Sequence, residues 1–424
     1  MFDDPVSLSG NPTDDNVAPQ VKPETKSKEF SFGPLKTIHV FWLAGMSCDG
    51  CTVAVAGATN PPLENLLTGT ITGLPQVILH HPVLSIEAGK EFIANFYKAE
   101  RGELDAPYVI CYEGSIADER IAAATGGYFS AIGSEQISHD VHRPIPTTEW
   151  LTRLAPGAAA VIAVGTCATW GGIPAAAGNP TNAMGVMDFL GKDYRSTTGL
   201  NIINIPGCSP IGDNFTETVG MILLFLQGIG PLPEFDSLGR PAWLFNDTVH
   251  TKCVRGGYYE EGNFTTEYGG KECLVEIGCW GPVVQCNITS RGAINHMGGC
   301  MNTGGICIGC TMPGFPDKFA PFYQMPPGST VSSTAVRSYA AVIRRLRRMT
   351  MRYQNMEPRW EITGEVPSGW GAFQKPSLIN HAMHYIYQKL QFANSVRPGD
   401  YVAKGSLKAK GVHTPEVLDH DAKL

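Results

Sequence analysis

Four short runs of mostly apolar, β-branched residues lie in the first half of the chain, each followed directly by a glycine-containing loop. The runs cover residues 37–43, 108–112, 160–164 and 201–205. Runs without a polar face are typical of parallel strands buried on both sides, and the segments between them are long enough for helices. The pattern predicts an α/β fold in which residues 35–235 form a flavodoxin-like domain around a parallel sheet.

This pattern weakens on both sides of the domain. Residues 1–34 contain five prolines among polar residues, which predicts a flexible N-terminal tail. Residues 236–325 consist largely of Gly, Cys and turn-forming residues, so we expect a loop-rich domain that bound metal organises. Residues 326–424 are expected to form a partly helical C-terminal extension.

The C-terminal extension begins with an arginine-rich segment. Residues 336–360 carry seven arginines against one acidic residue, and apolar side chains recur at helical spacing. Three interpretations fit this pattern: a solvated helix with an apolar stripe on the core, a docking surface for another subunit, and a contact with a membrane surface.

The charge and hydropathy argue against two classes of protein. The formal net charge is −7, which provides no basic field for binding nucleic acid. The most apolar run, residues 221–226, is far shorter than the roughly 20 residues of a membrane-spanning helix. Because residues 1–34 show neither a signal peptide nor a twin-Arg pair, we expect a cytoplasmic protein, with peripheral attachment to the inner face of the membrane as an alternative.

The twelve cysteines are too few for a disulfide framework and too clustered for core packing alone. Three of the four apolar runs are followed by cysteines, and Glu113 follows the remaining one. Ligands of open α/β sheets bind beyond the carboxyl ends of the strands. We therefore expect a metal–sulfur centre at that edge, formed by Cys48, Cys51, Cys167 and Cys208.

Two further groups of four candidate ligands follow within residues 250–310. Either group could bind zinc or an iron–sulfur cluster, because thiolates and imidazole suit both. Together with the first group they supply twelve ligands, enough for three four-coordinate centres, and leave Cys111 over as a core thiol. The two groups are His250, Cys253, Cys273 and Cys279, and then Cys286, Cys300, Cys307 and Cys310.

At this point a series of motifs, in order over residues 36–325, resembles the small subunit of nickel–iron hydrogenases. The ending at residues 311–317 and the missing twin-Arg signal are most similar to the actinobacterial-type, high-affinity, oxygen-tolerant uptake branch. The motifs are residues 41–51, Glu113-Gly-Ser115, Gly165-Thr-Cys-Ala-Thr169, Pro206-Gly-Cys208, His250-x-x-Cys253, residues 273–282 and Cys307-Ile-Gly-Cys310.

The resemblance implies that this chain carries an electron relay. The nickel–iron centre would lie in a large catalytic partner, so that no catalytic residue belongs to this chain. An external electron acceptor and a dimer or higher assembly of heterodimers are further implied partners. The implied ligands are Cys48, Cys51, Cys167 and Cys208 for a proximal cluster, Cys286, Cys307 and Cys310 for a medial cluster, and His250, Cys253, Cys273 and Cys279 for a distal cluster.

Three positions depart from the common family pattern. Cys300 replaces a proline, which predicts a four-iron medial cluster in place of a three-iron one, and hence three 4Fe-4S clusters in all. Asp49 stands where Thr is common, and its carboxylate either ligates a proximal iron or hydrogen-bonds nearby amides. Ser47 replaces a Glu to which a proton-handling role would otherwise be assigned. For Glu113, an accessory role in proton transfer and the orientation of loop amides are both open.

Two other functions compete with electron transfer in an uptake hydrogenase. The small subunit of a hydrogen-sensing, regulatory hydrogenase would carry the same ligands and report to a signalling partner. A zinc-binding interaction protein is the third alternative.

Overall fold

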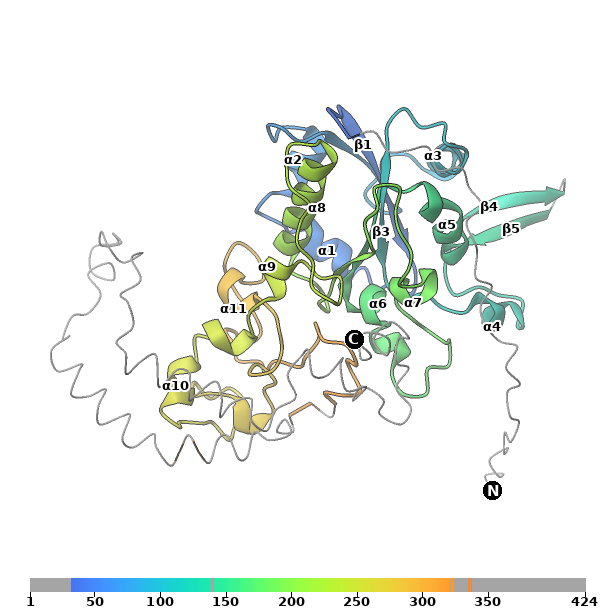
Figure 1. Ribbon diagram of the computed structural model, residues 1–424. Helices are drawn as coiled ribbons and strands as arrows, with labels where there is room; N and C mark the ends of the chain where they lie inside the picture. Colours follow the sequence, from blue (N-terminus) through green and yellow to red (C-terminus); the bar gives the residue numbers. More distant parts are fainter. Residues whose placement is uncertain (1–31, 139–140, 321, 324–334, 336, 338–424) are drawn as a thin grey trace, which may run out of the picture.

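In the computed structural model, residues 32–138, 141–320, 322–323, 335 and 337 are described. Five parallel strands form the central sheet in the order β2-β1-β3-β6-β7 (Figure 1), which is the strand order of a flavodoxin-like fold. This confirms the predicted α/β class with a parallel sheet. The strands are β1 (Thr37–Ala44), β2 (Gln76–His80), β3 (Tyr108–Glu113), β6 (Ala160–Val164) and β7 (Ile203–Ile205).

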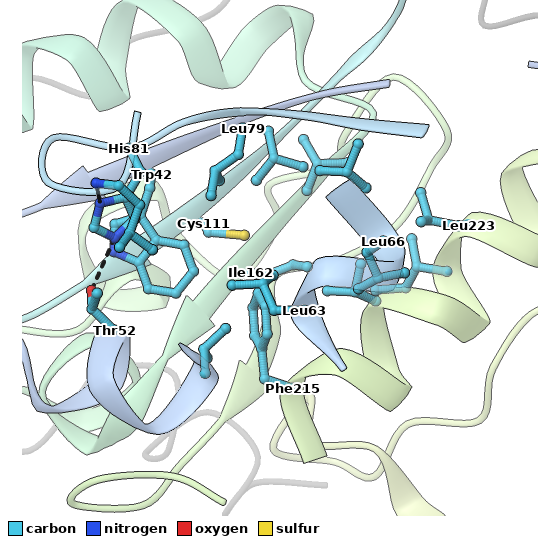
Figure 2. Close-up of a pocket in the computed structure, with 17 residues that line it drawn as sticks. Trp42, Thr52, Leu63, Leu66, Leu79, His81, Cys111, Ile162, Phe215 and Leu223 are labelled. Atoms are coloured by element: carbon cyan, nitrogen blue, oxygen red, sulfur yellow. Dashed lines mark hydrogen bonds between the residues drawn. The ribbon is translucent and has the colours of Figure 1, made fainter. Parts of the chain in front are cut away.

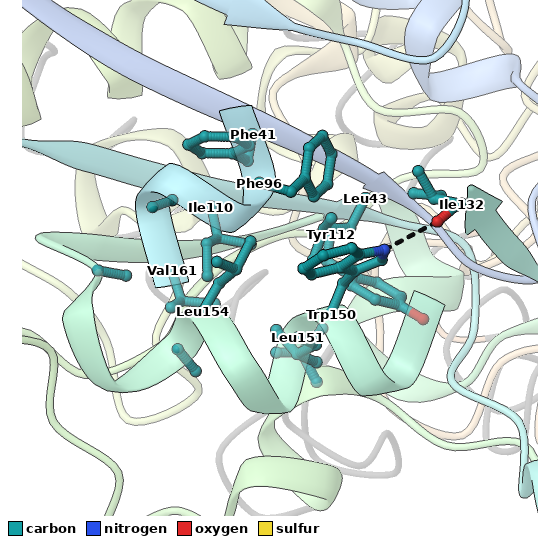
Figure 3. Close-up of a cluster of buried hydrophobic side chains, with 14 of the residues drawn as sticks. Phe41, Leu43, Phe96, Ile110, Tyr112, Ile132, Trp150, Leu151, Leu154 and Val161 are labelled. Carbon is teal, nitrogen blue, oxygen red and sulfur yellow. Dashed lines mark hydrogen bonds between the residues drawn. The ribbon is translucent and has the colours of Figure 1, made fainter. Parts of the chain in front are cut away.

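Helices cover both faces of the sheet, as the apolar strands require. Alternate residues of β1 point to opposite faces, so that Phe41 and Leu43 enter one core and Val40 and Trp42 the other. On the first face, Trp150 lies at the centre of the packed side chains (Figure 3), and its indole N–H donates to the Ile132 carbonyl at 2.8 Å. The helices of this domain are α1 (Gly50–Ala56), α2 (Leu63–Thr68), α3 (Gly89–Arg101), α4 (Glu119–Ala123), α5 (Thr147–Leu154), α6 (Gly165–Trp170), α7 (Val186–Leu190) and α8 (Gly212–Leu226).

Two features of this domain were not anticipated from the sequence. Strand β2 is short, ends at His80 and is followed by His81, so its three apolar residues do not stand out as an apolar run. The antiparallel hairpin of β4 (Ala131–Ser138) and β5 (Val141–Pro146) carries mainly polar residues and two prolines, and it projects from the domain in Figure 1. Arg143 on the hairpin pairs with Glu135 and Glu149 at 2.8 and 2.6 Å.

The second part of the described chain is loop-rich, as expected. Its core is a separate apolar cluster that includes the ligand candidates Cys279 and Cys307. Regular structure is limited to α9 (Ala242–Phe245), α10 (Gly256–Glu260), α11 (Ile288–Arg291) and the 3-10 turns η3 (Val249–Lys252) and η4 (Val275–Ile277). With so little regular structure, this part depends on its side-chain contacts and on any group that it binds.

Residues 1–31 of the predicted N-terminal tail and most of the C-terminal extension lie outside the described residues. Arg337 is an exception. It pairs with Glu276 at 2.6 Å and lies over the Phe264 ring, 5.4 Å from the centroid. This contact places one residue of the extension against the loop between Cys273 and Cys279. Among the described residues, no helix is long and apolar enough to cross a membrane.

Candidate metal centres

Three segments at the carboxyl edge of the sheet, one after each of β1, β6 and β7, bring Cys48, Cys51, Cys167 and Cys208 together. Burial raises the pKa of the Cys51 thiol strongly, and Glu113 and the three other thiols raise it further, which shows that all four lie within electrostatic reach. Likewise, burial and then the neighbouring Cys208 raise the pKa of Cys167 to about 11. These four residues follow β1, β6 and β7, as expected from the sequence.

Glu113 lies at the end of β3, behind Cys51, with 1% of its surface exposed. One carboxylate oxygen accepts the backbone N–H groups of Cys51 and Thr52 at 3.0 and 3.3 Å. The other accepts the indole N–H of Trp42 at 2.9 Å and the hydroxyl of Thr52 at 2.5 Å. Glu113 therefore orients the amides at the start of α1, one of the two roles left open by the sequence.

A hydrogen-bonded chain extends from Glu113 to His81. The ring nitrogen Nδ1 of His81 accepts the backbone N–H groups of Val83 and Leu84 at 3.0 and 3.2 Å, so the proton of the neutral ring lies on Nε2. Nε2 then donates to the Thr52 hydroxyl at 3.0 Å, which in turn donates to Glu113. Nothing in the sequence indicated His81 or Thr52, because their connection to the site is purely spatial.

Glycines allow the chain to approach the ligand sulfurs closely. Gly172 has a φ of 57°, and a Cβ atom there would lie 2.8 Å from the Cys167 sulfur. Gly165 has a φ of 84°, and a Cβ atom there would overlap the Cys51 sulfur. Any larger residue would therefore displace these thiols as well as strain the backbone.

Asp49 is the exposed N-cap residue of α1, with a left-handed φ of 59°. Its backbone N–H donates to the Ser47 hydroxyl at 3.0 Å. Burial lowers the pKa of the nearby His81 to about 4, while the carboxylates of Glu113 and Asp49 act in the opposite direction. The Asp49 carboxylate therefore lies within electrostatic reach of the His81 ring.

The second group consists of Cys286, Cys300, Cys307 and Cys310. Burial raises the pKa of Cys286 to about 12, and Cys300 raises it further. Burial and neighbouring thiols, including Cys300, likewise raise the pKa values of Cys307 and Cys310. Cys300 is therefore within electrostatic reach of all three other thiols and completes a group of four.

The third group, His250, Cys253, Cys273 and Cys279, lines one cavity. Burial raises the pKa of Cys273 to about 12 and that of Cys279 to about 11. Burial also lowers the pKa of His250 to about 4, which favours the neutral imidazole that a metal ligand requires. The N–H of Arg255 donates to the Cys253 sulfur at 3.4 Å.

Hydrogen bonds link each group to the next. A backbone hydrogen bond from Cys208 of the first group lowers the pKa of the Cys310 thiol in the second group. The backbone N–H of Cys307 in the second group donates to the Cys279 sulfur of the third, at 3.3 Å. The three groups therefore form a continuous series through the protein.

Helix α6 holds the second group against the sheet domain. The Thr166 hydroxyl donates to the Cys310 carbonyl and accepts the Gly207 N–H at 2.9 Å. One turn further, the Trp170 indole donates to the Thr311 carbonyl at 3.3 Å. No pattern in the sequence indicated this contact for Thr166 or Trp170, although Thr166 directly precedes a predicted ligand.

The donor set fits iron–sulfur clusters. All twelve cysteines are free thiols, and amide donors surround the sulfurs of the three groups, an arrangement that stabilises cluster thiolates. Within the described ranges, no three His, Cys, Asp or Glu side chains converge on a single metal-ion position. A cluster of several irons spreads its ligands over its corners and can accommodate such an arrangement.

Cys111 lies apart from the three groups, within β3. Its sulfur faces an apolar cavity between the sheet and helices α2 and α8, as Figure 2 shows. Trp42 and Phe215 are among the lining residues, and the His81–Thr52 hydrogen bond closes one end. Burial raises the pKa of Cys111, which keeps it a neutral thiol.

Comparison with known proteins supports the same assignment. The family model for the NADH ubiquinone oxidoreductase 20 Kd subunit matches residues 48–222, and that for the C-terminal part of the NiFe/NiFeSe hydrogenase small subunit matches residues 245–323. The chain is 30% identical to the periplasmic [NiFeSe] hydrogenase small subunit of Desulfomicrobium baculatum, covering 68% of this chain and 87% of the relative. It is 31% identical to the hydrogenase-2 small chain of Escherichia coli, covering 65% and 67% of the two chains.

A solved structure gives a stronger match. The actinobacterial-type NiFe-hydrogenase from Ralstonia eutropha H16 superimposes with a TM-score of 0.72 at 50% identity, over 78% of this chain and 94% of the other. Hydrogenases of this kind are oxidoreductases in which a small, electron-transferring subunit with iron–sulfur clusters works in complex with a large subunit that holds the nickel–iron centre. The chain belongs to the family of nickel–iron hydrogenase small subunits.

Proposed function

We propose that this chain serves an uptake hydrogenase, passing electrons from H2 oxidation in the large subunit through three iron–sulfur clusters to an external acceptor. The observation that carries the proposal is the series of three groups of four ligands, each linked to the next by hydrogen bonds. When bound, the clusters supply one-electron redox chemistry. The chain's own residues hold the ligands, surround the sulfurs with donors and fix the spacing between groups.

We further propose that all three clusters are of the 4Fe-4S type. The position of Cys300 beside three other thiols supports a four-iron medial cluster. Replacing the residue by the proline common in the family, Cys300→Pro, should yield the electron paramagnetic resonance signal of a three-iron cluster. Cys111→Ser is the matched control, because it removes a thiol outside the groups. An unchanged medial signal in Cys300→Pro would contradict the assignment.

Ligation of a proximal iron by Asp49 is a separate proposal, supported by its exposed position in the chain between the ligands Cys48 and Cys51. Asp49→Ala should then change the spectrum and the reduction potential of the proximal cluster. Asp49→Asn keeps the side-chain size and tests whether the negative charge is required. Wild-type spectra in both variants would leave Asp49 with the backbone role of an N-cap alone.

The surface around the proximal group is a suitable contact face for the large subunit. Cys48 and Cys208 are exposed there, and Val53 and Ile173 beside them are 70% and 57% exposed. A partner that covers this face would shield both the cluster and the apolar side chains.

We also propose that the heterodimers assemble into a dimer or a higher oligomer, which light scattering of the purified complex tests. We further propose that the complex lies on the cytoplasmic side or at the inner face of the membrane, which cell fractionation tests.

Reduction of the purified complex with H2 tests the proposed function. If the chain serves an uptake hydrogenase, spectroscopic signals of three reduced clusters should appear when H2 is added, and the complex should reduce dyes rapidly in steady state. A regulatory, hydrogen-sensing subunit is the alternative, and slow dye reduction together with a stable complex with a signalling protein would favour it. Failure of H2 to reduce any cluster would contradict both.

A further inference from the structure

A buried arginine outside the three ligand groups faces the medial one. Arg240 lies in the segment between the sheet domain and the loop-rich part, and its side chain is 3% exposed. Burial of a guanidinium is unfavourable unless other interactions compensate. Arginine nevertheless retains its charge in proteins, so a positive charge is fixed inside the molecule at this position.

The polar contacts of Arg240 hold its side chain in a defined orientation. Its guanidinium pairs with Asp236 at 2.7 Å, donates to the Gln285 side-chain oxygen at 2.5 Å and approaches the Met312 sulfur at 3.8 Å. It also lies over the Phe245 ring, 5.3 Å from the centroid. The guanidinium therefore cannot turn towards solvent without losing several contacts.

Two of these contacts are with residues that lie close to medial ligands along the chain. Gln285 immediately precedes Cys286, and Met312 is two residues beyond Cys310. Arg240 thus contacts residues that lie one and two positions along the chain from two of the four medial ligands, Cys286 and Cys310.

The ion pair does not cancel this charge at the medial group. The Asp236 side chain is 25% exposed, compared with 3% for Arg240, so water screens the carboxylate more than the guanidinium. Within the described part of the chain, Asp236 is the one carboxylate that pairs with Arg240. The less exposed, positive member of the pair is therefore the one that contacts Gln285 beside Cys286.

We propose that Arg240 raises the reduction potential of the medial cluster by placing a fixed positive charge beside Cys286, with Asp236 partly opposing it. This proposal rests on the proposed function, because it assumes a cluster at the medial group. A nearby positive charge stabilises the reduced, more negative form of a cluster. It offsets the fourth thiolate, Cys300, whose negative charge lowers the potential.

Redox titration of the medial cluster, followed by electron paramagnetic resonance of the purified heterodimer, tests the proposal through opposite shifts. Arg240→Gln should move the medial potential to more negative values, and Arg240→Lys should restore most of the shift. Asp236→Asn, which keeps an oxygen for the turn amides, should move the potential in the positive direction. Arg143→Gln on the distant hairpin also removes a paired guanidinium and should leave the potential unchanged.

The outcomes separate this proposal from the proposed function. If the medial cluster is present and the Arg240 and Asp236 variants leave its potential unchanged, or shift it in the same direction, the charge effect is refuted and the relay is unaffected. Should Arg240→Gln fail to assemble, the positive shift in Asp236→Asn still decides. Absence of any medial signal in the wild-type complex would instead contradict the proposed function.

Discussion

Thr166 is positioned to fix the distance between the proximal and medial groups, and Thr166→Val tests this. The nearly isosteric valine removes the hydroxyl that joins the Gly207 N–H to the Cys310 carbonyl. Each buried backbone group left without a partner destabilises the fold by about 1–3 kcal/mol. With two such groups, we expect a total loss of about 2–6 kcal/mol.

Thr166→Ser is the matched control, because it keeps the hydroxyl and removes a single buried methyl group. That change should lower the stability by about 1 kcal/mol. For a unit of this size, 1 kcal/mol corresponds to about 2–4 °C in unfolding temperature. The purified complex should therefore unfold about 4–24 °C lower with valine and no more than about 4 °C lower with serine.

A second measurement distinguishes spacing from general stability. The magnetic interaction between the proximal and medial clusters depends steeply on their separation, so we expect it to weaken in the Thr166→Val variant and to persist in the serine variant. The reasoning would be refuted if the two variants gave the same unfolding temperature and the same spectra.

Two further predictions follow from the same structure. Gly172→Ala should reduce the proximal iron content because the new Cβ atom meets the Cys167 sulfur. The control is Gly178→Ala: Gly178 has a φ of 94° and open space around it, so this change strains the backbone without touching a ligand. Equal iron loss in both variants would argue against the close approach at Gly172. Burial, with help from His39, lowers the pKa of His80 to about 4, so the unfolded state binds the proton more readily and stability falls as the pH drops from 6.5 towards 4. Between pH 7 and pH 5, His80 should lower the free energy of unfolding by about 2 kcal/mol, which is measurable as a lower unfolding temperature. The His80→Gln variant should lose less stability over this range. Identical profiles of stability against pH for the wild type and the variant would contradict this prediction.

The sheet was largely predictable from the sequence because its strands are buried on both faces. Four of the five strands appeared as mostly apolar runs, and their parallel order follows from the helices between them. Strand β2 and the β4–β5 hairpin were missed. The short apolar run of β2 lies between Gln76 and two histidines, and the polar residues and prolines of the hairpin obscure the periodicity on which the prediction depends.

The grouping of the candidate ligands could be predicted from the sequence, whereas the residues around them could not. Because thiols are recognised by residue type and spacing, the sequence predicts which cysteines belong together, such as Cys48 with Cys51, and the structure brings these residues close to one another. Thr166, His81 and Arg240 belong to common residue types and reach the groups from distant segments. Only the folded arrangement brings them there, and so no local pattern could have indicated them.

Metal and sulfide analysis of the complex, purified without oxygen, tests the central claim most directly. Three four-iron clusters predict about twelve iron atoms and about twelve acid-labile sulfides per copy of this chain, beyond the iron of the large subunit. A colourless protein with stoichiometric zinc and no sulfide would contradict the account.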